Sequence, residues 1–213
     1  MVIFGGFTRT LQGNIGFNSQ TDLNDGFIVL DEHDLIVNNQ ATNAFVRDTG
    51  FVVNTDSSAT GPYGFIRWRI NNAAAGSVYE YPFGSLDGDY QPFIYEVQTA
   101  GTPSGTGSID VATYRTDWTV PINNRPLPSF VTNINSDIGT ENSPRAVDRF
   151  WLVEANNYTT NPVGELTFSY VDKEFALPQN NINEAILQAR IWEAGPNVWS
   201  TPFGTVNVAQ NQV

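Results

Sequence analysis

Residues that interrupt helices recur throughout the chain and constrain its fold more than any other feature. Clusters of Asn, Gly, Asp and Pro return about every 10 to 15 residues, and 12 prolines are spread over the 213 positions. A proline inside a helix removes a backbone hydrogen bond and clashes with the preceding turn, so few windows remain where a helix could grow. Short β-branched and aromatic runs between these turns predict an all-β protein.

Alternating patterns in the second part of the chain predict antiparallel sheets. Ile66 and Trp68 fall on one side of a strand, and Arg67 falls on the other. One apolar face per strand is typical of an antiparallel sheet with one solvated side, and two such sheets pack into a sandwich. We therefore predict an antiparallel β-sandwich, jelly-roll or immunoglobulin-like, with a short strand-rich N-terminal extension. Similar alternation marks residues 93–98, 109–114, 150–153 and 166–170.

The chain divides near residue 58, within a small polar connector that spans 56–62. Residues 1–58 form a strand-rich N-terminal segment, and residues 59–213 form the predicted sandwich domain. The dipeptide Gly-Phe begins at Gly6, Gly16, Gly26 and Gly50, and the first three lie ten residues apart. This spacing indicates either short β-repeats packed on the sandwich or chance in a chain rich in both residues. Short strands are expected at residues 3–11, 27–30, 35–37 and 51–53.

Residues 183–192 fit two structures. Asn183 could cap a helix in which Ile186, Leu187 and Ile191 share a face, and the same residues also alternate as a strand. The turn-forming residues 195–197 and the tryptophan that follows them favour a hairpin. We predict a strand, because sheet context often overrides local propensity.

Composition and charge remove several classes of function. The chain carries 22 acidic and 10 basic side chains, a net charge of −12 and a pI near 4.2. Phosphate backbones and anionic lipids would be repelled, so we expect no nucleic-acid partner. No apolar run approaches the ~20 residues of a membrane span, so we expect no membrane insertion. The first residues lack the pattern of a signal peptide, and Met1 fits the start of an excised fragment.

Several motifs occur in a defined order. Gly50-Phe51-Val52-Val53-Asn54 is followed by Tyr81-Pro82-Phe83-Gly84 and Tyr90-Gln91-Pro92. Arg149-Phe150-Trp151, Tyr170-Val171-Asp172-Lys173-Glu174 and a segment from Trp192 to Trp199 come later. Over about residues 35 to 208, this order resembles a β-sandwich module of large secreted or cell-surface proteins of Bacteroidota. The resemblance implies export by the type IX secretion route and an extracellular or cell-surface location. Modules of this kind are generally of unknown function.

The residues give little support to catalysis. Cysteine is absent and His33 is the single histidine, which excludes thiolate chemistry and His-paired zinc sites. The cluster 31–34 places carboxylates beside that histidine, but consecutive residues alternate in a strand and are solvated in a turn. No Gly-x-Ser-x-Gly elbow supplies a nucleophile, and the sequence pairs no two carboxylates across a cleft. The charged run 172–174 is interpreted as a salt-bridged strand end, and we expect no enzymatic activity.

Calcium is the metal that the loops could bind. Asp22, Asn24 and Asp25 offer three oxygen side chains in four positions, and Asp87 and Asp89 flank a glycine. Hard cations take several oxygen ligands from flexible loops. Neither loop completes an EF-hand pattern, and in a plain turn the same Asp and Asn side chains bond their own backbone. No other cofactor is expected.

Aromatic residues raise the possibility of sugar binding. Trp118 lies in a polar stretch before a proline, and Tyr158 is a second candidate for a flat ring presented to a glycan. Most other tryptophans lie in alternating strands, where burial in the core is the commoner outcome. The long irregular stretch 121–147 is a further candidate for function.

We expect a noncatalytic extracellular structural or adhesive module that forms a surface fibre or layer. Its partners would be neighbouring copies or modules that pair through edge strands. The alternative is a carbohydrate-binding module, and a glycoside hydrolase comes third. The terminal stretches 1–11 and 205–213 hold one charged side chain between them, Arg9, and lack the lysine that often protects sheet edges. They pair either within the chain or with a neighbouring copy, in which case deleting residues 1–11 should abolish assembly and leave a folded body.

Overall fold

A computed structural model describes most of the chain. The described residues are 2–4, 8–54, 63–117, 125, 127–136, 139–176 and 180–213. Over this part the chain is all-β, as predicted, and its only helical elements are four short 3-10 turns. Two compact units emerge. Unit 1 holds Met1–Thr55, Pro62–Thr113 and Trp151–Thr167, and unit 2 holds Asp56–Gly61, Tyr114–Phe150 and Phe168–Val213. Both units cross the boundary expected near residue 58, and the connector 56–62 lies outside the described residues.

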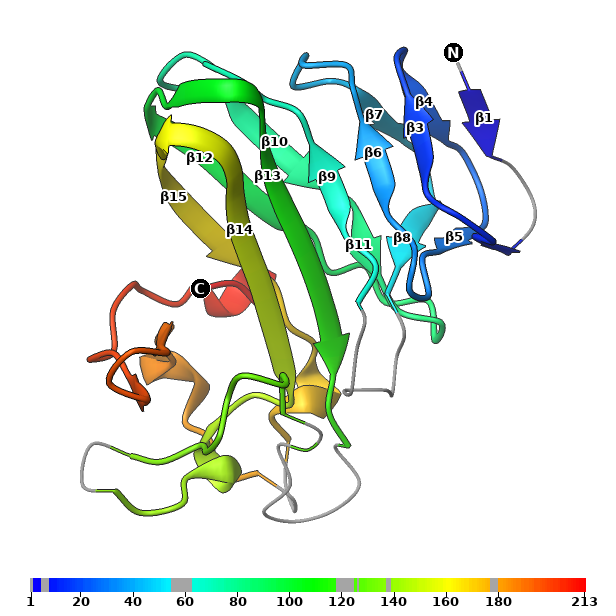
Figure 1. The fold of residues 1–213 in the computed structure, drawn as a ribbon. Coiled ribbons are helices and arrows are strands. Elements are labelled where there is room, and N and C mark those ends of the chain that lie inside the picture. The colour runs from blue at the N-terminus through cyan, green and yellow to red at the C-terminus, as the bar shows by residue number, and fades with distance from the viewer. Residues whose placement is uncertain are drawn as a thin grey trace. The chain divides into compact units, whose positions relative to one another are not determined.

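Unit 1 begins with short strands that return to the same three sheets in turn (Figure 1). Each turn of chain adds one parallel strand to each sheet, which is the pattern of a β-solenoid. The antiparallel prediction concerned residues 59–213; for residues 1–58 the sequence indicated either short β-repeats or chance, and strands of three residues are too short to show in which direction they pair. The first sheet holds β1 (Val2–Phe4), β4 (Thr21–Leu23) and β7 (Phe45–Arg47); the second holds β2 (Arg9–Thr10), β5 (Phe27–Val29) and β8 (Phe51–Val53); the third holds β3 (Ile15–Phe17), β6 (Leu35–Val37) and β9 (Ile66–Trp68).

Apolar side chains stack in rows along the solenoid. Leu35 is in register with Ile66, and Val37 with Trp68, and all four side chains are fully buried. Ile28 and Val52 make a similar row in the second sheet. Each row removes apolar surface from water at roughly 25 cal/mol per Å², so the stacked rungs make a continuous core.

The Gly-Phe dipeptides mark one corner of the solenoid rather than a ten-residue repeat. Phe27 and Phe51 are in register and their rings stack with centroids 4.3 Å apart. Gly26 has a φ of +84°, and a Cβ on Gly50 would lie 2.8 Å from the Gly26 carbonyl oxygen. Glycine is therefore required at both positions, once for conformation and once for close approach. Gly16 lies in β3 of a different sheet, and Gly6 lies outside the described residues.

The later strands of unit 1 pair mainly antiparallel. One sheet has the order β10 (Val78–Tyr81), β12 (Phe93–Thr99) and β15 (Val163–Phe168). The third solenoid sheet continues through β13 (Thr102–Arg115), which is antiparallel to β9, to β14 (Arg149–Thr160). The second continues into β11 (Phe83–Gly84), which is parallel to β8. Aromatic rings, among them Trp68, Tyr81, Phe93 and Trp151, contact one another in this part of the core.

Unit 2 contains little regular structure. Its 3-10 turns are η1 (Ser143–Arg145), η2 (Asp172–Glu174), η3 (Glu184–Ile186) and η4 (Val208–Gln210), and its hairpin is β16 (Trp192–Glu193) with β17 (Val198–Trp199). The hairpin is as predicted, but the strand predicted for 183–192 is wrong. Local bonds favour a turn there, since Ile186 N–H donates to the Asn183 carbonyl, and only the last residue of that range enters a strand.

Both terminal stretches pair within the chain. In unit 1, β1 and β2 lie parallel to β4 and β5. In unit 2, the backbone of Val213 exchanges hydrogen bonds with Phe168, and η4 lies within the stretch 205–213. The first of these pairings still leaves β1, β2 and β3 as the last strands of their sheets in the described part of the chain.

Candidate functional site

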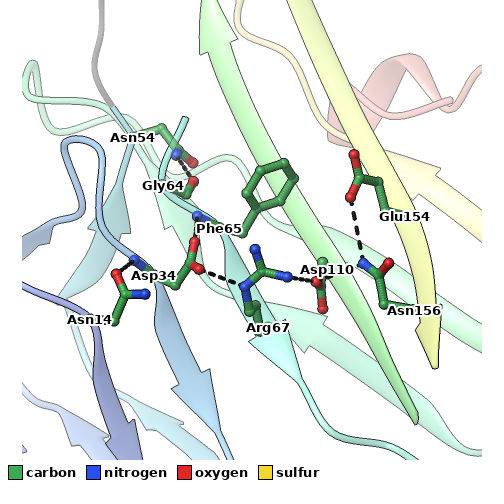
Figure 2. Close-up of polar contacts among 9 residues, drawn as sticks. All are labelled: Asn14, Asp34, Asn54, Gly64, Phe65, Arg67, Asp110, Glu154 and Asn156. Atoms are coloured by element: carbon green, nitrogen blue, oxygen red, sulfur yellow. Dashed lines mark hydrogen bonds and ion pairs between the residues drawn. The ribbon is translucent and has the colours of Figure 1, made fainter. Parts of the chain in front are cut away.

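A row of polar side chains crosses the third sheet of unit 1 from β3 to β14 (Figure 2). Asn14 Oδ1 accepts a hydrogen bond from the Asp34 backbone N–H at 2.9 Å. Asp34 in turn accepts from the Phe65 N–H at 3.0 Å and from Arg67 Nε at 2.6 Å. The same guanidinium donates to Asp110 through Nη1, so Arg67 bridges two carboxylates.

The far end of this polar row lies on β14. Asn156 Nδ2 donates to Asp110 Oδ2 at 2.9 Å and approaches Glu154 Oε2 at 3.5 Å. Asp110 is fully buried on β13, whereas Arg67 keeps about a third of its side-chain surface exposed (35%). The row therefore links solenoid strands to antiparallel strands through consecutive charged and amide groups.

Burial and charge oppose one another within the row. Burial raises the pKa of Asp110, while a Ser108 hydrogen bond, the charge of Arg67 and the Asn156 hydrogen bond act to lower it. Burial lowers the pKa of Arg67, but the Asp34 hydrogen bond and the charges of both aspartates raise it above its ordinary value. Removing the guanidinium would leave a buried carboxylate without its counter-charge, which is costly. The arrangement therefore favours fixed positions for these strands.

A second polar cluster is buried in unit 2. Arg149 donates to Glu174 through Nε at 3.0 Å and through Nη2 at 2.5 Å, and both side chains are almost completely buried. Asp148 is 3% exposed and accepts from Asn180 Nδ2 at 2.7 Å and from Thr116 Oγ1 at 3.4 Å. Two motifs of the sequence thus meet here, and Glu174 pairs with an arginine.

Burial raises the pKa of Asp148 to about 7. The hydrogen bonds from Asn180 and Thr116 oppose this rise, and the negative charges of Glu174 and Asp117 add to it. A carboxylate that titrates near neutral pH is often found at functional sites, but structural networks produce the same shift.

The residues expected to bind calcium lie mainly in structural turns. The Asn24 backbone carbonyl accepts from the N–H and hydroxyl of Thr49 in the next rung, and Asp25 is exposed. Asp22 lies in β4, and its Oδ1 is buried without a hydrogen-bond partner in the described part of the chain. No group of three or more His, Asp or Glu that could hold a metal occurs among the described residues. Calcium binding at these loops stays a prediction.

The second loop expected to bind calcium, which holds Asp87 and Asp89, is also a structural turn. Asp89 Oδ2 accepts from Ser85 Oγ at 3.0 Å, and the Gly88 N–H donates to the Ser85 carbonyl. Gly88 has a φ of +94°, which a tight turn requires, and Asp87 is exposed beside it. The two carboxylates therefore flank a turn in which Asp89 bonds its own loop.

Of the two expected sugar-binding residues, the structure places one. Tyr158 lies against Gly107 and Gly101, where a Cβ would come within 2.5 Å and 2.8 Å of its ring. Its hydroxyl donates to the Asn71 carbonyl at 2.8 Å, and burial raises its pKa. These contacts give the ring a packing role in the sheet. Trp118 lies outside the described residues.

His33 and its neighbours lie at a corner between β5 and β6. The His33 N–H donates to the Leu30 carbonyl, and Asp31 has a φ of +54°. Asp34 alone of this cluster joins the polar row. Sequence reasoning missed the remaining members of the row, although it had placed Arg67 on the face of its strand opposite Ile66 and Trp68.

Unit 2 also has a shallow hollow of about 550 Å³, where Arg145 and Arg190 lie with Glu141.

No family model, curated protein or solved structure matches this chain. Among the described residues, no helix has the length and apolar character to cross a membrane.

Proposed function

We propose that this chain is a noncatalytic extracellular structural or adhesive module of a surface fibre or layer. The observation that carries the proposal is the solenoid, in which β1, β2 and β3 are the outermost strands of three sheets within the described residues. An edge strand offers backbone donors and acceptors to another chain, and proteins usually protect such edges when no partner is intended. Neighbouring copies or modules are therefore the partners, and they associate through these edges.

The extracellular location and the sandwich fold are part of the same proposal. The module resembles those of secreted and cell-surface proteins of Bacteroidota, and an acidic surface with a net charge of −12 suits a soluble extracellular part. Its antiparallel strands form a β-sandwich of the jelly-roll or immunoglobulin-like type. The antiparallel pairing of β10 with β12 and of β9 with β13 supports this assignment.

The proposal is tested by location and by association. Protease treatment of intact cells of the source organism should degrade the native protein, and sedimentation of the purified chain should show concentration-dependent association. A protein that is protected inside cells, or that stays monomeric at millimolar concentration, would contradict the proposal. The deletion of residues 1–11 is a weaker test, because it would uncover Leu23 and Ile28 of the second rung, which are buried.

A carbohydrate-binding module is the second candidate, and the polar row favours it. Asp34 and the partly exposed Arg67 present planar hydrogen-bonding groups, and the Arg67 guanidinium lies 5.4 Å from the Phe65 ring centroid. Sugar sites combine such groups with aromatic faces. Binding on a glycan array that Arg67→Met abolishes would support this candidate, and turnover of a bound glycan would support a glycoside hydrolase, the third.

A further inference from the structure

The hollow of unit 2 has the size of a binding site for a small molecule. Its volume is about 550 Å³, within the roughly 300–1,000 Å³ of such sites. The described residues of its lining come from the stretch 136–145, which includes η1, and from Arg190, which lies two residues before β16. The proposed association through solenoid edges makes no use of this hollow, because those edges belong to unit 1.

Backbone hydrogen bonds hold both segments of the lining. The Arg145 N–H donates to the Asn142 carbonyl at 2.9 Å. Ala189, which precedes Arg190, exchanges two backbone hydrogen bonds with Phe203, at 2.9 Å and 3.0 Å. A site whose backbone is already ordered loses less entropy when it binds a ligand.

Two arginines line the hollow, although the whole chain carries only 10 basic side chains and a net charge of −12. Arg145 is exposed, and among the described residues its side chain has no hydrogen-bond or ion-pair partner; Arg190 is half-buried. Glu141 also lies here, but its carboxylate accepts from the Ser143 N–H at 3.2 Å and 3.1 Å and from the Ser143 hydroxyl. The two guanidinium groups outnumber this carboxylate, which its own turn holds. Since a guanidinium binds a carboxylate through two parallel hydrogen bonds, the charges favour a ligand with a carboxylate.

Uncharged polar groups complete the lining. Ser136 Oγ is buried and has no hydrogen-bond partner in the described part of the chain, which is a costly state for a hydroxyl. The Thr140 hydroxyl and the Asn142 amide add further donors and acceptors, and the Pro144 ring adds an apolar surface. Hydroxyl and amide groups beside a small apolar surface suit a pyranose ring, which has polar edges and an apolar face.

We propose that this hollow binds a single hexuronic acid residue at the end of a glycan. The sugar carboxylate accepts hydrogen bonds from Arg145 and Arg190, and a sugar hydroxyl bonds Ser136 Oγ. A net charge of −12 repels a long polyanion, so the ligand is one terminal uronate rather than a run of them. The site is separate from the polar row of unit 1.

The test compares two probes, methyl β-glucuronide and methyl β-glucoside. They differ only at the sixth carbon, which is a carboxylate in the first and a hydroxymethyl group in the second. The full chain, labelled with nitrogen-15, is titrated with each probe and followed by nuclear magnetic resonance. The glucuronide should shift backbone resonances of residues 139–145 and of Arg190 and should saturate. The glucoside should bind at least tenfold more weakly, because it cannot pair with the arginines.

Arginine variants locate the binding. Arg145→Met and Arg190→Met should each raise the dissociation constant for the glucuronide at least tenfold. Arg69→Met, which removes a half-buried arginine of unit 1, is the matched control and should bind as the native chain does. Matching circular dichroism and melting temperatures would show that a loss of binding is not a loss of fold. Arg145 is exposed, so at least this variant should fold.

Several results would overturn the inference. They are equal affinity for the two probes, no saturable shift at the hollow, or an equal loss in Arg145→Met and Arg69→Met. Displacement of the glucuronide by an equal concentration of inorganic phosphate would show a general anion site and would reject the sugar. Sedimentation measures the association of copies separately. A chain that self-associates and does not bind the glucuronide would therefore reject this site and leave the proposed function intact.

Discussion

Asp148 provides a prediction about how stability depends on pH. Its carboxylate is 3% exposed, lies between Asn180 and Thr116, and has its pKa raised to about 7 by burial. In an unfolded chain the pKa of an aspartate is about 3.9. Between these two values, the folded state binds a proton that the unfolded state has released.

The sign of the effect follows from this difference. Since the folded protein holds more protons, the free energy of unfolding falls as pH rises from about 4 to about 7, and this group changes it little above that. One pKa unit corresponds to about 1.4 kcal/mol, so a difference of about three units corresponds to roughly 4 kcal/mol. The nearby carboxylates of Glu174 and Asp117 add to the cost of ionising Asp148.

The substitution Asp148→Asn removes the titration and keeps the side-chain shape. We expect the variant to be more stable than the native chain by about 2 to 4 kcal/mol at pH 8, and to show a smaller fall between pH 4 and 7. Urea unfolding at constant ionic strength, followed by far-ultraviolet circular dichroism, measures both. Glu193→Gln removes an exposed carboxylate of the same unit and is the control. Equal pH slopes for the native chain and Asp148→Asn would refute the reasoning.

Three further predictions concern unit 1. Arg67→Met should lower the free energy of unfolding at pH 7 by about 3 kcal/mol, because it leaves the buried Asp110 carboxylate without its counter-charge. The control Arg69→Met should lower it much less. An equal loss in both variants on urea unfolding would contradict a role for the polar row. Gly50→Ala should cost about 1 to 3 kcal/mol, because its Cβ would lie 2.8 Å from a carbonyl oxygen, while Gly195→Ala, with open space around it, should be neutral. Calcium should raise the melting temperature of the native chain and not that of Asp89→Asn, and no rise for either would remove this loop as a site.

Local sequence could locate many of the strands. The short apolar runs at 27–30, 35–37 and 51–53 each contain a strand, because turn residues bound them and no helical period competes. The local sequence does not predict that these strands stack in parallel. Val2 pairs with Thr21 and Thr21 pairs with Phe45, so the rungs differ in length and no fixed period repeats. A strand of three residues also carries too little alternation to select a parallel or antiparallel neighbour.

The polar row shows why the candidate site was only partly predictable. Alternation placed Arg67 on the face opposite Trp68, and this side chain does extend over the less apolar face of the sheet. Its partner Asp34 directly precedes β6 and its partner Asp110 lies in β13, and the adjacency of these strands to β9 depends on the solenoid and on the switch to antiparallel pairing. The spacing of these residues in the sequence does not predict which strands are neighbours. The ion pairs can therefore be identified only when the register between the strands is known. The same dependence makes the row informative about the fold: Arg67 reaches both carboxylates because β6, β9 and β13 are neighbours in this order, and the buried Asp110 would otherwise lack its counter-charge.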